Sequence, residues 1–215
     1  MKKNNSFLLK YKNIHKGQKA VLFGSGPTIK NFDPISIPPD FIRAGSNEQI
    51  FLDLDLDYWF MCDTTDDKNK FWNKFDNYNN YKPKKSKFIA DMGEVRNKPP
   101  KGIKHAEYYY SEKKHSFTKN INSELIPTKV SITFDIIQFL LYMGIKIIYL
   151  VGHDCDYSKG TFTGTKIGKY QNSGPSIIER WKNCNKWINE EYPDTKIYSI
   201  NPVKLKLFET KNKIE

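Results

Sequence analysis

The chain has 215 residues, in which 35 Lys and Arg outnumber 24 Asp and Glu and give a formal net charge of +11. A chain of this length can fold without a disulfide scaffold, and 14 Phe, 13 Tyr and 4 Trp are too many for a long disordered segment. No run of about 18 apolar residues is present, so the sequence predicts no membrane span. We therefore expect one domain over residues 1–215, and three widely separated cysteines favour a reducing, cytoplasmic setting.

Compact apolar runs, closed by glycine or polar residues, predict strands that are buried on both faces. These runs lie at residues 19–23, 41–47, 58–63, 87–90, 146–151 and 196–200. A short helix is expected from Pro27 to Asp33, a buried helix over 131–143 that stops at Gly144, and a helix over 176–191.

The remaining stretches are polar or irregular. We expect a short helix or arm over 1–18, a helix plus loop over 64–87, irregular chain over 92–128, and a mobile loop over 155–175. Buried strands that alternate with helices indicate an α/β fold with a mostly parallel sheet. In such sheets ligands bind outside the carboxyl ends of the strands, so the residues that follow each strand are the candidates for a site.

The first of these segments is Gly24-Ser25-Gly26-Pro27-Thr28. Glycines at this place let backbone N–H groups approach an anion. The segment is not a dinucleotide fingerprint, because Ile29 stands where that motif has its third glycine, and no Gly-Lys-Ser/Thr of a P-loop follows. The alternative is a tight turn between a strand and a helix.

Polar residues also follow the next two strands. Asn47 is placed to hydrogen-bond a base or ribose, or else serves as a turn residue or N-cap. Asp63 ends a buried strand, where a carboxylate is costly unless it is exposed or paired, with an N-cap as the alternative. The alternating Asp53, Asp55 and Asp57 resemble a metal-binding pattern, but we favour a solvated turn and predict no metal site.

Gly152, His153 and Asp154 follow the most apolar strand. His153 is the candidate general base, with Asp154 either orienting it or contacting a sugar hydroxyl. The alternative is a structural aspartate beside a histidine that has no role. The loop over 155–175 contains Tyr157 and Phe162 and is expected to close over a substrate, unless it is an ordinary surface loop.

The net charge also raises the question of a nucleic-acid partner. Lysines are spread along the chain, and only residues 82–87 form a tight basic cluster. We interpret the charge as a general surface field that attracts anionic ligands and favours peripheral contact with a membrane. A functional nucleic-acid partner is the weaker interpretation.

Three blocks of the sequence, VLFGSGPTIKNFD, IRAGSNEQ and SITFDIIQFLLYMGIKIIYLVGHDCDYSKG, resemble the bacterial sialyltransferases of glycosyltransferase family 42. They are also similar to the related DUF115 proteins, which include motility accessory factors and a pterin pyrophosphokinase. The shared pattern is a strand with Gly-x-Gly-Pro-Ser, a strand that ends in Asn, and a late Ile-Tyr-Leu-x-Gly-x-Asp. It spans mainly residues 19–65 and 128–160.

This resemblance implies a Rossmann-like, three-layer GT-A-variant fold that binds a cytidine nucleotide-sugar without a metal ion or other cofactor. By position it places Asn47 and Asp63 against the base, ribose or donor sugar, Ser131 near the donor, and Tyr157 against a phosphate. The residues that it places against the nucleotide are Gly24, Ser25, Gly26, Pro27, Thr28 and Gly152.

One departure from the family bears on catalysis. The sialyltransferases take their base from a histidine in the lid, and residues 155–215 contain no histidine. The leading hypothesis is transfer of a sialic-acid-like sugar from a CMP-activated donor to a glycan acceptor, with His153, or next Asp154, as the base. Phosphoryl transfer of the pterin diphosphokinase type with Mg²⁺, and nucleotide or nucleic-acid binding without catalysis, stay open.

Overall fold

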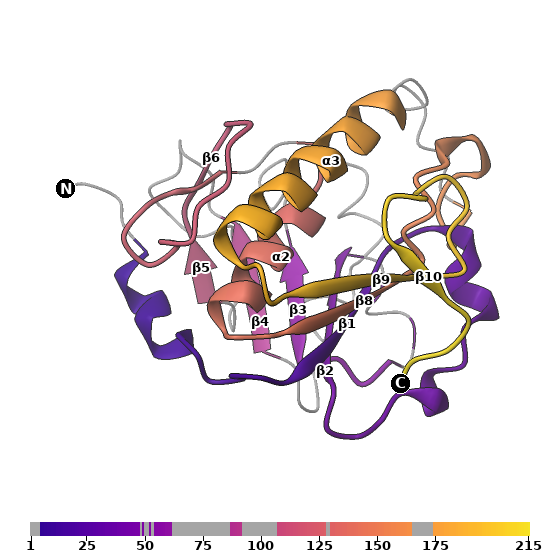
Figure 1. The fold of residues 1–215 in the computed structure, drawn as a ribbon, viewed down its shortest axis with the longest axis horizontal. Coiled ribbons are helices and arrows are strands. Elements are labelled where there is room, and N and C mark those ends of the chain that lie inside the picture. The colour runs from indigo at the N-terminus through magenta and orange to yellow at the C-terminus, as the bar shows by residue number, and fades with distance from the viewer. Residues whose placement is uncertain are drawn as a thin grey trace, which may run out of the picture.

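The computed structural model describes residues 5–47, 49, 52, 54–61, 87–91, 107–127, 130–164 and 174–215 (Figure 1). The expected helix and loop over 64–86, most of the basic cluster at 82–87, and the candidates Asp53 and Asp63 lie outside these residues. Nothing in the fold bears on whether the chain is a single domain, so that expectation stays a prediction.

The core of the protein is an eight-stranded sheet in which every neighbouring pair of strands is parallel. Its order is β10-β9-β8-β1-β2-β3-β4-β5. The strands are β1 (Lys19–Phe23), β2 (Ile42–Ser46), β3 (Tyr58–Met61), β4 (Lys87–Asp91), β5 (Glu107–Tyr109), β8 (Ile147–Val151), β9 (Lys196–Ile200) and β10 (Glu209–Lys211). The predicted α/β fold with a parallel sheet is confirmed.

Each apolar run that predicted a strand forms one within the described residues. The sequence pattern missed β5, β10 and a small parallel sheet of β6 (Ser111–Glu112) and β7 (Ile126–Pro127). These strands have only two or three residues, which is too short for a hydrophobic period to be visible. The expectation of irregular chain over 92–128 was therefore wrong at β5, β6 and β7.

Helices form where the periodicity predicted them. They are α2 (Thr133–Tyr142) and α3 (Gly174–Glu191), and the 3₁₀ segment η2 (Pro27–Asn31) lies where a short helix was expected. The 3₁₀ segment η1 (Ser6–Tyr11) forms in the expected helix or arm over 1–18, whereas η3 (Pro34–Ser36) and η5 (Tyr157–Lys159) were not predicted. Gly144 follows α2 at φ +90°, and a Cβ there would lie 2.8 Å from the Lys16 Cα, so the predicted helix stop is confirmed. Of the helices that the structure describes, none has the length and apolar character needed to cross a bilayer.

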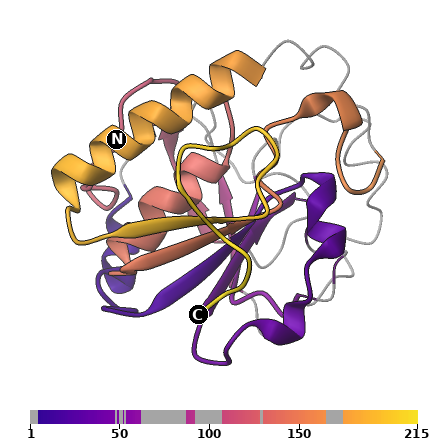
Figure 2. The ribbon, with the colours of Figure 1, turned by 45° about the vertical axis from the view of Figure 1, so that its right-hand side comes forward.

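The two faces of the sheet have different coverings. On one face, Ala20 and Leu22 of β1 pack in a cluster with the buried sides of α2 and α3. On the opposite face, Val21 and Phe23 pack in a second cluster with Ile29 of η2 and with loop residues. Figure 2 shows α2 and α3 on the same side of the sheet. Alternate residues of one strand thus build two separate cores.

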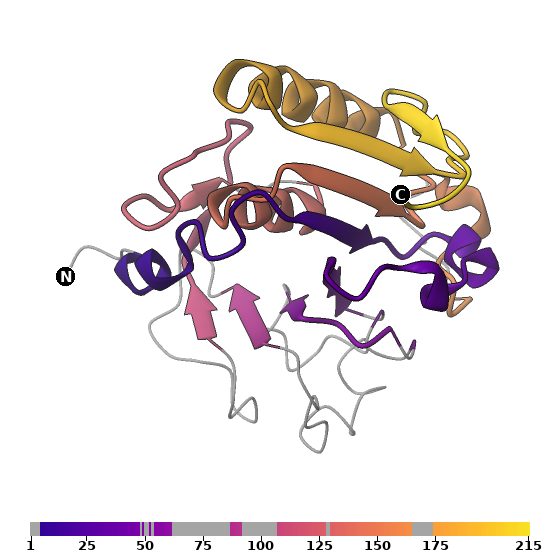
Figure 3. The ribbon, with the colours of Figure 1, turned by 60° about the horizontal axis from the view of Figure 1, so that its bottom comes forward.

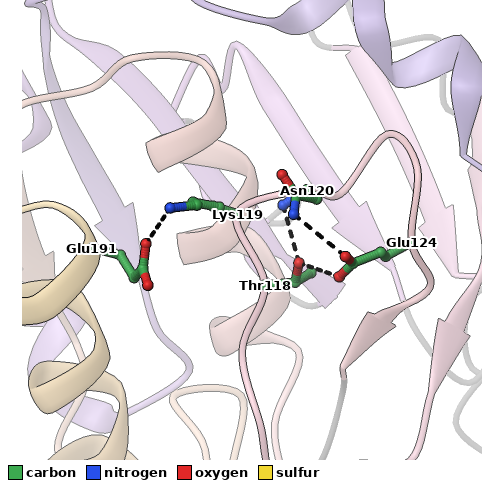
Figure 4. A network of polar contacts seen from close by, with 5 residues as sticks. All are labelled: Thr118, Lys119, Asn120, Glu124 and Glu191. Atoms are coloured by element: carbon green, nitrogen blue, oxygen red, sulfur yellow. Dashed lines mark hydrogen bonds and ion pairs between the residues drawn. The ribbon is translucent and has the colours of Figure 1, made fainter.

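The segment between β6 and β7 is tied to both helices (Figure 4). Thr118 and Asn120 bond to Glu124, and Lys119 forms an ion pair with Glu191 of α3. Thr118 N–H also donates to the buried Gln138 Oε1 of α2 at 2.9 Å. The helical face is therefore held by polar contacts at its rim as well as by its apolar core.

Candidate functional site

The strand order reverses direction between β1 and β8. Chain that leaves β1 continues to β2, β3, β4 and β5 on one side, whereas β8, β9 and β10 extend the sheet on the other side. Figure 3 shows the arrowheads of β1, β8 and β9 pointing to the same edge, where η2 and the chain after β8 lie. A ligand site in a doubly wound sheet is expected at such a reversal, at the carboxyl ends of the strands.

The turns after β1 and β8 lie in direct contact. Gly24 N–H donates to Val151 O and Gly26 N–H donates to Gly152 O, each at 2.7 Å. A Cβ on Gly26 would lie 2.5 Å from Asp154 Cγ and 2.6 Å from Gly152 O, so only glycine fits without a shift. Gly152 itself has φ +71°, which favours glycine. The predicted glycine-rich turn thus exists because two backbones approach closely.

Asp154 is a buried residue, 4% exposed, and its side chain joins the two turns. Its Oδ2 accepts Thr28 N–H at 3.0 Å, and its Oδ1 accepts the Thr28 hydroxyl. The carboxylate therefore caps the first turn of η2 from a neighbouring strand. This buried, hydrogen-bonded state is the structural alternative that the sequence left open for Asp154.

These bonds change how the turn after β1 can meet an anion. The N–H groups of Gly24, Gly26 and Thr28 are engaged by Val151, Gly152 and Asp154. These three amides are therefore occupied by partners within the protein, and the expectation that backbone N–H groups of this turn approach an anion stays a prediction. Contact of residues 24–28 with a nucleotide through other atoms stays a prediction.

Ser25 lies on the open side of the same turn, and Gln49 connects it to β2. Gln49 Nε2 donates to Ser25 Oγ at 2.7 Å, and Gln49 Oε1 accepts Ser46 N–H at 2.6 Å. The Ser25 carbonyl accepts Phe162 N–H at 2.9 Å from the chain after β8. The sequence analysis overlooked Gln49, because a lone glutamine in a polar stretch carries no motif.

His153 faces the opposite side of the sheet from Asp154. Its Nε2 lies 3.2 Å from Leu22 O, and its ring meets the Trp181 ring edge-on at 5.7 Å. Burial lowers the pKa of His153 from 6.5 to about 4. The imidazole is therefore neutral at pH 7, and its Nδ1 is a much weaker base than an ordinary histidine.

The other predicted site residues lie at the same edge of the sheet or outside the described part. Asn47 follows β2 in a left-handed conformation at φ 49°, and its carbonyl accepts Trp59 Nε1–H at 3.0 Å. Ser131 precedes α2 and accepts Thr133 N–H at 3.3 Å. Tyr157 begins η5. Their contacts with a ligand, and that of Asp63, stay predictions.

The chain after β9 closes the far side of the site. Lys204 N–H donates to Asp154 O at 2.9 Å, and Lys204 Nζ lies 3.0 Å from Asp156 Oδ1. Hydrogen bonds from Ser158, with help from Lys204, lower the pKa of Asp156 to about 2. Asp156 is therefore an anion that is already paired with Lys204. The Lys204 ammonium group is held beside the turn that follows β8.

Carboxylates in the described residues do not gather as metal ligands do. Within residues 5–47, 49, 52, 54–61, 87–91, 107–127, 130–164 and 174–215, no three His, Cys, Asp or Glu form a group that could hold a metal ion. Asp57 instead accepts Arg43 N–H at 2.9 Å and supports the start of β2. This is consistent with the favoured interpretation of residues 53–57 as a turn, although Asp53 lies outside the described residues.

No protein-family model matches the chain, and no curated protein matches its sequence. Solved structures of sialyltransferases match its fold. A variant of the sialyltransferase CST-II in complex with CMP aligns at a TM-score of 0.51 and 14% identity, over 90% of this chain and 86% of that one. A second CST-II variant in complex with CMP has a TM-score of 0.51 and 15% identity, over 85% and 80%.

Monomeric CstII gives a similar result, with a TM-score of 0.50 and 15% identity over 85% of this chain and 80% of that one. CstII comes from Campylobacter jejuni. At these identities the likeness establishes the α/β sialyltransferase-like fold, which confirms that part of the resemblance. The likeness to DUF115 proteins stays a prediction.

Proposed function

We propose that this chain binds a CMP-activated, sialic-acid-like sugar and transfers the sugar to a glycan acceptor. The observation that carries the proposal is the meeting of the turns after β1 and β8 at the point where the strand order reverses. Two of the solved sialyltransferase structures that share this fold are complexes with CMP. The net charge of +11 favours an anionic donor of this kind.

In the proposed reaction an acceptor hydroxyl attacks the anomeric carbon of the donor sugar as the bond from that carbon to the phosphate oxygen breaks. The acceptor proton passes to a base, and CMP leaves with the electron pair. From the described residues we assign two donors to the phosphate side. Ser25 lies on the turn after β1, and Lys204, in the chain after β9, is bonded to the turn after β8 through Asp154 O. No metal ion takes part in this proposal.

Two described groups are candidates for the base, His153 and Asp154. His153 has a pKa of about 4, and both oxygens of Asp154 accept bonds from Thr28. The pKa of His153 therefore lies well below the working pH, whereas the Asp154 carboxylate is engaged by Thr28. This observation favours a second candidate function, in which the chain binds the nucleotide without transferring a sugar.

Titration calorimetry with CMP, AMP and inorganic phosphate tests the binding step. We expect CMP to bind at least ten times more tightly than AMP, on the order of 1.4 kcal/mol, and without added metal. A separate titration with ATP, with and without Mg²⁺, tests the alternative, and a chain that binds only ATP, and only with Mg²⁺, would point to phosphoryl transfer instead. A chain that binds no CMP contradicts the proposal.

The transfer step is tested by incubation with CMP-sialic acid, with CMP release measured in the presence and absence of a glycan acceptor. Acceptor-dependent CMP release supports the transferase. Binding of CMP without any release supports the second candidate function. Release that is unchanged in His153→Ala removes His153 as the base, and Lys204→Ala tests whether the ammonium group assists the leaving phosphate.

A further inference from the structure

Gln49 links the ends of β1 and β2 and is fully buried, with 0% of its surface exposed. Its Oε1 accepts Ser46 N–H at 2.6 Å, and its Nε2 donates to Ser25 Oγ at 2.7 Å. A backbone N–H can only donate, so the amide oxygen must lie toward Ser46. The amide nitrogen must then face Ser25, and the orientation of the Gln49 amide is determined by its partners.

This orientation determines whether the Ser25 hydroxyl donates or accepts in its bond with Gln49. The amide N–H of Gln49 is also only a donor, so Ser25 Oγ is an acceptor in that bond and keeps its own proton. Among the residues that the structure describes, no acceptor receives the Ser25 O–H. The Ser25 side chain is half-buried, so a ligand at the carboxyl ends of the strands can reach it.

The backbone of Ser25 is held in place as well. Its carbonyl accepts Phe162 N–H at 2.9 Å, and Phe162 is 5% exposed in the core on that face. The neighbouring N–H groups of Gly24, Gly26 and Thr28 are all engaged within the protein. The Ser25 hydroxyl can therefore donate to a ligand, and its position is held by the bonds that the Ser25 carbonyl and Oγ accept.

We propose that Gln49 is a positioning residue that keeps the Ser25 hydroxyl as a hydrogen-bond donor to the phosphate of the bound nucleotide. The proposal rests on the proposed function, which supplies the phosphate. An anionic oxygen can only accept, so a hydroxyl that is already set to donate binds it without first having to rotate. Gln49 acts through Ser25 and does not touch the nucleotide.

Three substitutions separate this role from a merely structural one. In Gln49→Glu the carboxylate can accept from both Ser46 N–H and the Ser25 hydroxyl, which keeps the bridge but takes the serine proton. Gln49→Met breaks the bridge and leaves the hydroxyl free to rotate. A structural role predicts that Glu is tolerated better than Met, whereas our proposal predicts the opposite order for CMP affinity.

The CMP dissociation constant is measured by calorimetry at pH 8, well above the ordinary pKa of a glutamate, to favour the ionised carboxylate. We expect Ser25→Ala to weaken CMP binding by about 10- to 100-fold and Ser25→Thr, which keeps the hydroxyl, by about 3-fold or less. Gln49→Met should cost about 3- to 10-fold, and Gln49→Glu about 100-fold. Gln18→Glu places the same charge change before the start of β1 and should leave the CMP affinity unchanged.

A double-mutant cycle tests whether Gln49 acts through Ser25. In a Ser25→Ala background, Gln49→Met should have almost no further effect, and the remaining effect of Gln49→Glu measures charge repulsion alone. If the loss of CMP affinity in the double variant Ser25→Ala, Gln49→Met equals the product of the two single losses, this inference is overturned and the proposed function stands. The same holds if Gln49→Glu binds CMP like the wild type. A wild-type chain that binds no CMP overturns the proposed function, and this inference with it.

Thermal unfolding of each variant without ligand serves as the control for folding. Gln49→Glu is expected to fold because both of its hydrogen bonds can persist, but to unfold at a lower temperature than the wild type because a carboxylate at this fully buried position loses its hydration. Should Gln49→Met fail to fold, the comparison of Ser25→Ala, Ser25→Thr and Gln49→Glu still decides the outcome. A loss of CMP binding that Ser25→Thr does not restore contradicts the role of the hydroxyl.

Discussion

The face of the sheet that carries α2 and α3 differs from the opposite face in both its covering and its chemistry. On the helical face, Phe134, Phe139 and Trp181 pack with the apolar residues of β1 and β8, and all three are buried. On the opposite face, among the described residues, the apolar side chains meet 3₁₀ segments and loops. Polar contacts between the strand ends, such as Asp154 with Thr28, lie beside that second core.

The difference shows how one sheet can separate stability from ligand binding. A helix satisfies its own backbone, so it can cover a sheet with apolar side chains alone. Loops leave backbone groups that need partners, and the partners at the ends of β1, β2 and β8 are the polar residues of the candidate site. Consecutive residues divide the same way, because His153 lies toward Trp181 whereas Asp154 lies toward Thr28.

The largest expected effect compares a buried tryptophan from each face. Trp181→Ala should lower the free energy of unfolding by about 4 kcal/mol, because Phe134 and Phe208 enclose its ring and cannot easily collapse into the cavity. Trp59→Ala, on the loop-covered face, should cost at least about 1 kcal/mol less. Urea unfolding of both variants checks this. Equal losses would contradict the division of stability between the faces.

The second effect is a dependence of stability on pH that comes from His153. Its pKa is 6.5 in the unfolded chain and about 4 in the folded protein, so between these values the unfolded state binds more protons. The free energy of unfolding should therefore fall by about 3 kcal/mol as the pH drops from 7 to 4.

His153→Gln should flatten this part of the pH profile, measured by urea unfolding at each pH. His115→Gln changes an exposed imidazole and serves as the matched control, which should leave the slope as in the wild type. A slope that is the same in His153→Gln and in the wild type would show that the imidazole is not held neutral on the helical face.

The third effect concerns the close approach of the two turns. Gly26→Ala should destabilise the protein by about 2 kcal/mol, because the new Cβ would lie 2.5 Å from Asp154 Cγ. Gly17→Ala is the control, because Gly17 has φ +81° but no atom lies within 4 Å of the new Cβ. This variant should lower the free energy of unfolding by about 1 kcal/mol, from backbone strain alone. Thermal unfolding of both variants measures the difference, and CMP affinity should fall only in Gly26→Ala.

The smallest expected effect belongs to the bond between Thr28 and Asp154. Thr28→Val keeps the volume but removes the hydroxyl donor, so it should lower the free energy of unfolding by about 1 kcal/mol. Thr210→Val, at an exposed position of β10, should change it by less than about 0.5 kcal/mol. Chemical denaturation of the two variants checks the contrast, and equal values would show that the Thr28 hydroxyl adds nothing.

Local patterns in the sequence accounted for the central strands and for α2 and α3, the α-helices of the described residues. The runs at 19–23 and 146–151 are apolar without interruption, because strands buried on two faces leave no polar side. Gly24-x-Gly26 and Gly152 also predicted turns directly after these strands. The pattern could not show that the turn after β1 bonds to the turn after β8, since that depends on how β1 and β8 pair.

Several parts of the site carry no local signal at all. Gln49 lies 24 residues from Ser25 in the sequence, and Asp154 lies 126 residues from Thr28. The environment of His153 depends on Trp181 and Leu22, which reach it from two other elements. A pairing between distant residues leaves no period or motif in a single sequence, so reasoning from that sequence could name the candidates but not their partners.

The sequence by itself determined the class of fold, the positions of the buried strands and helices, and the edge of the sheet at which polar residues gather. It did so because hydrophobic period and turn residues are local properties of the chain. Only the tertiary structure decided the state of each polar group. Packing places His153 in an apolar environment, ties Asp154 to Thr28, and leaves the Ser25 hydroxyl as a donor, because burial and hydrogen-bond partners are properties of the assembled sheet.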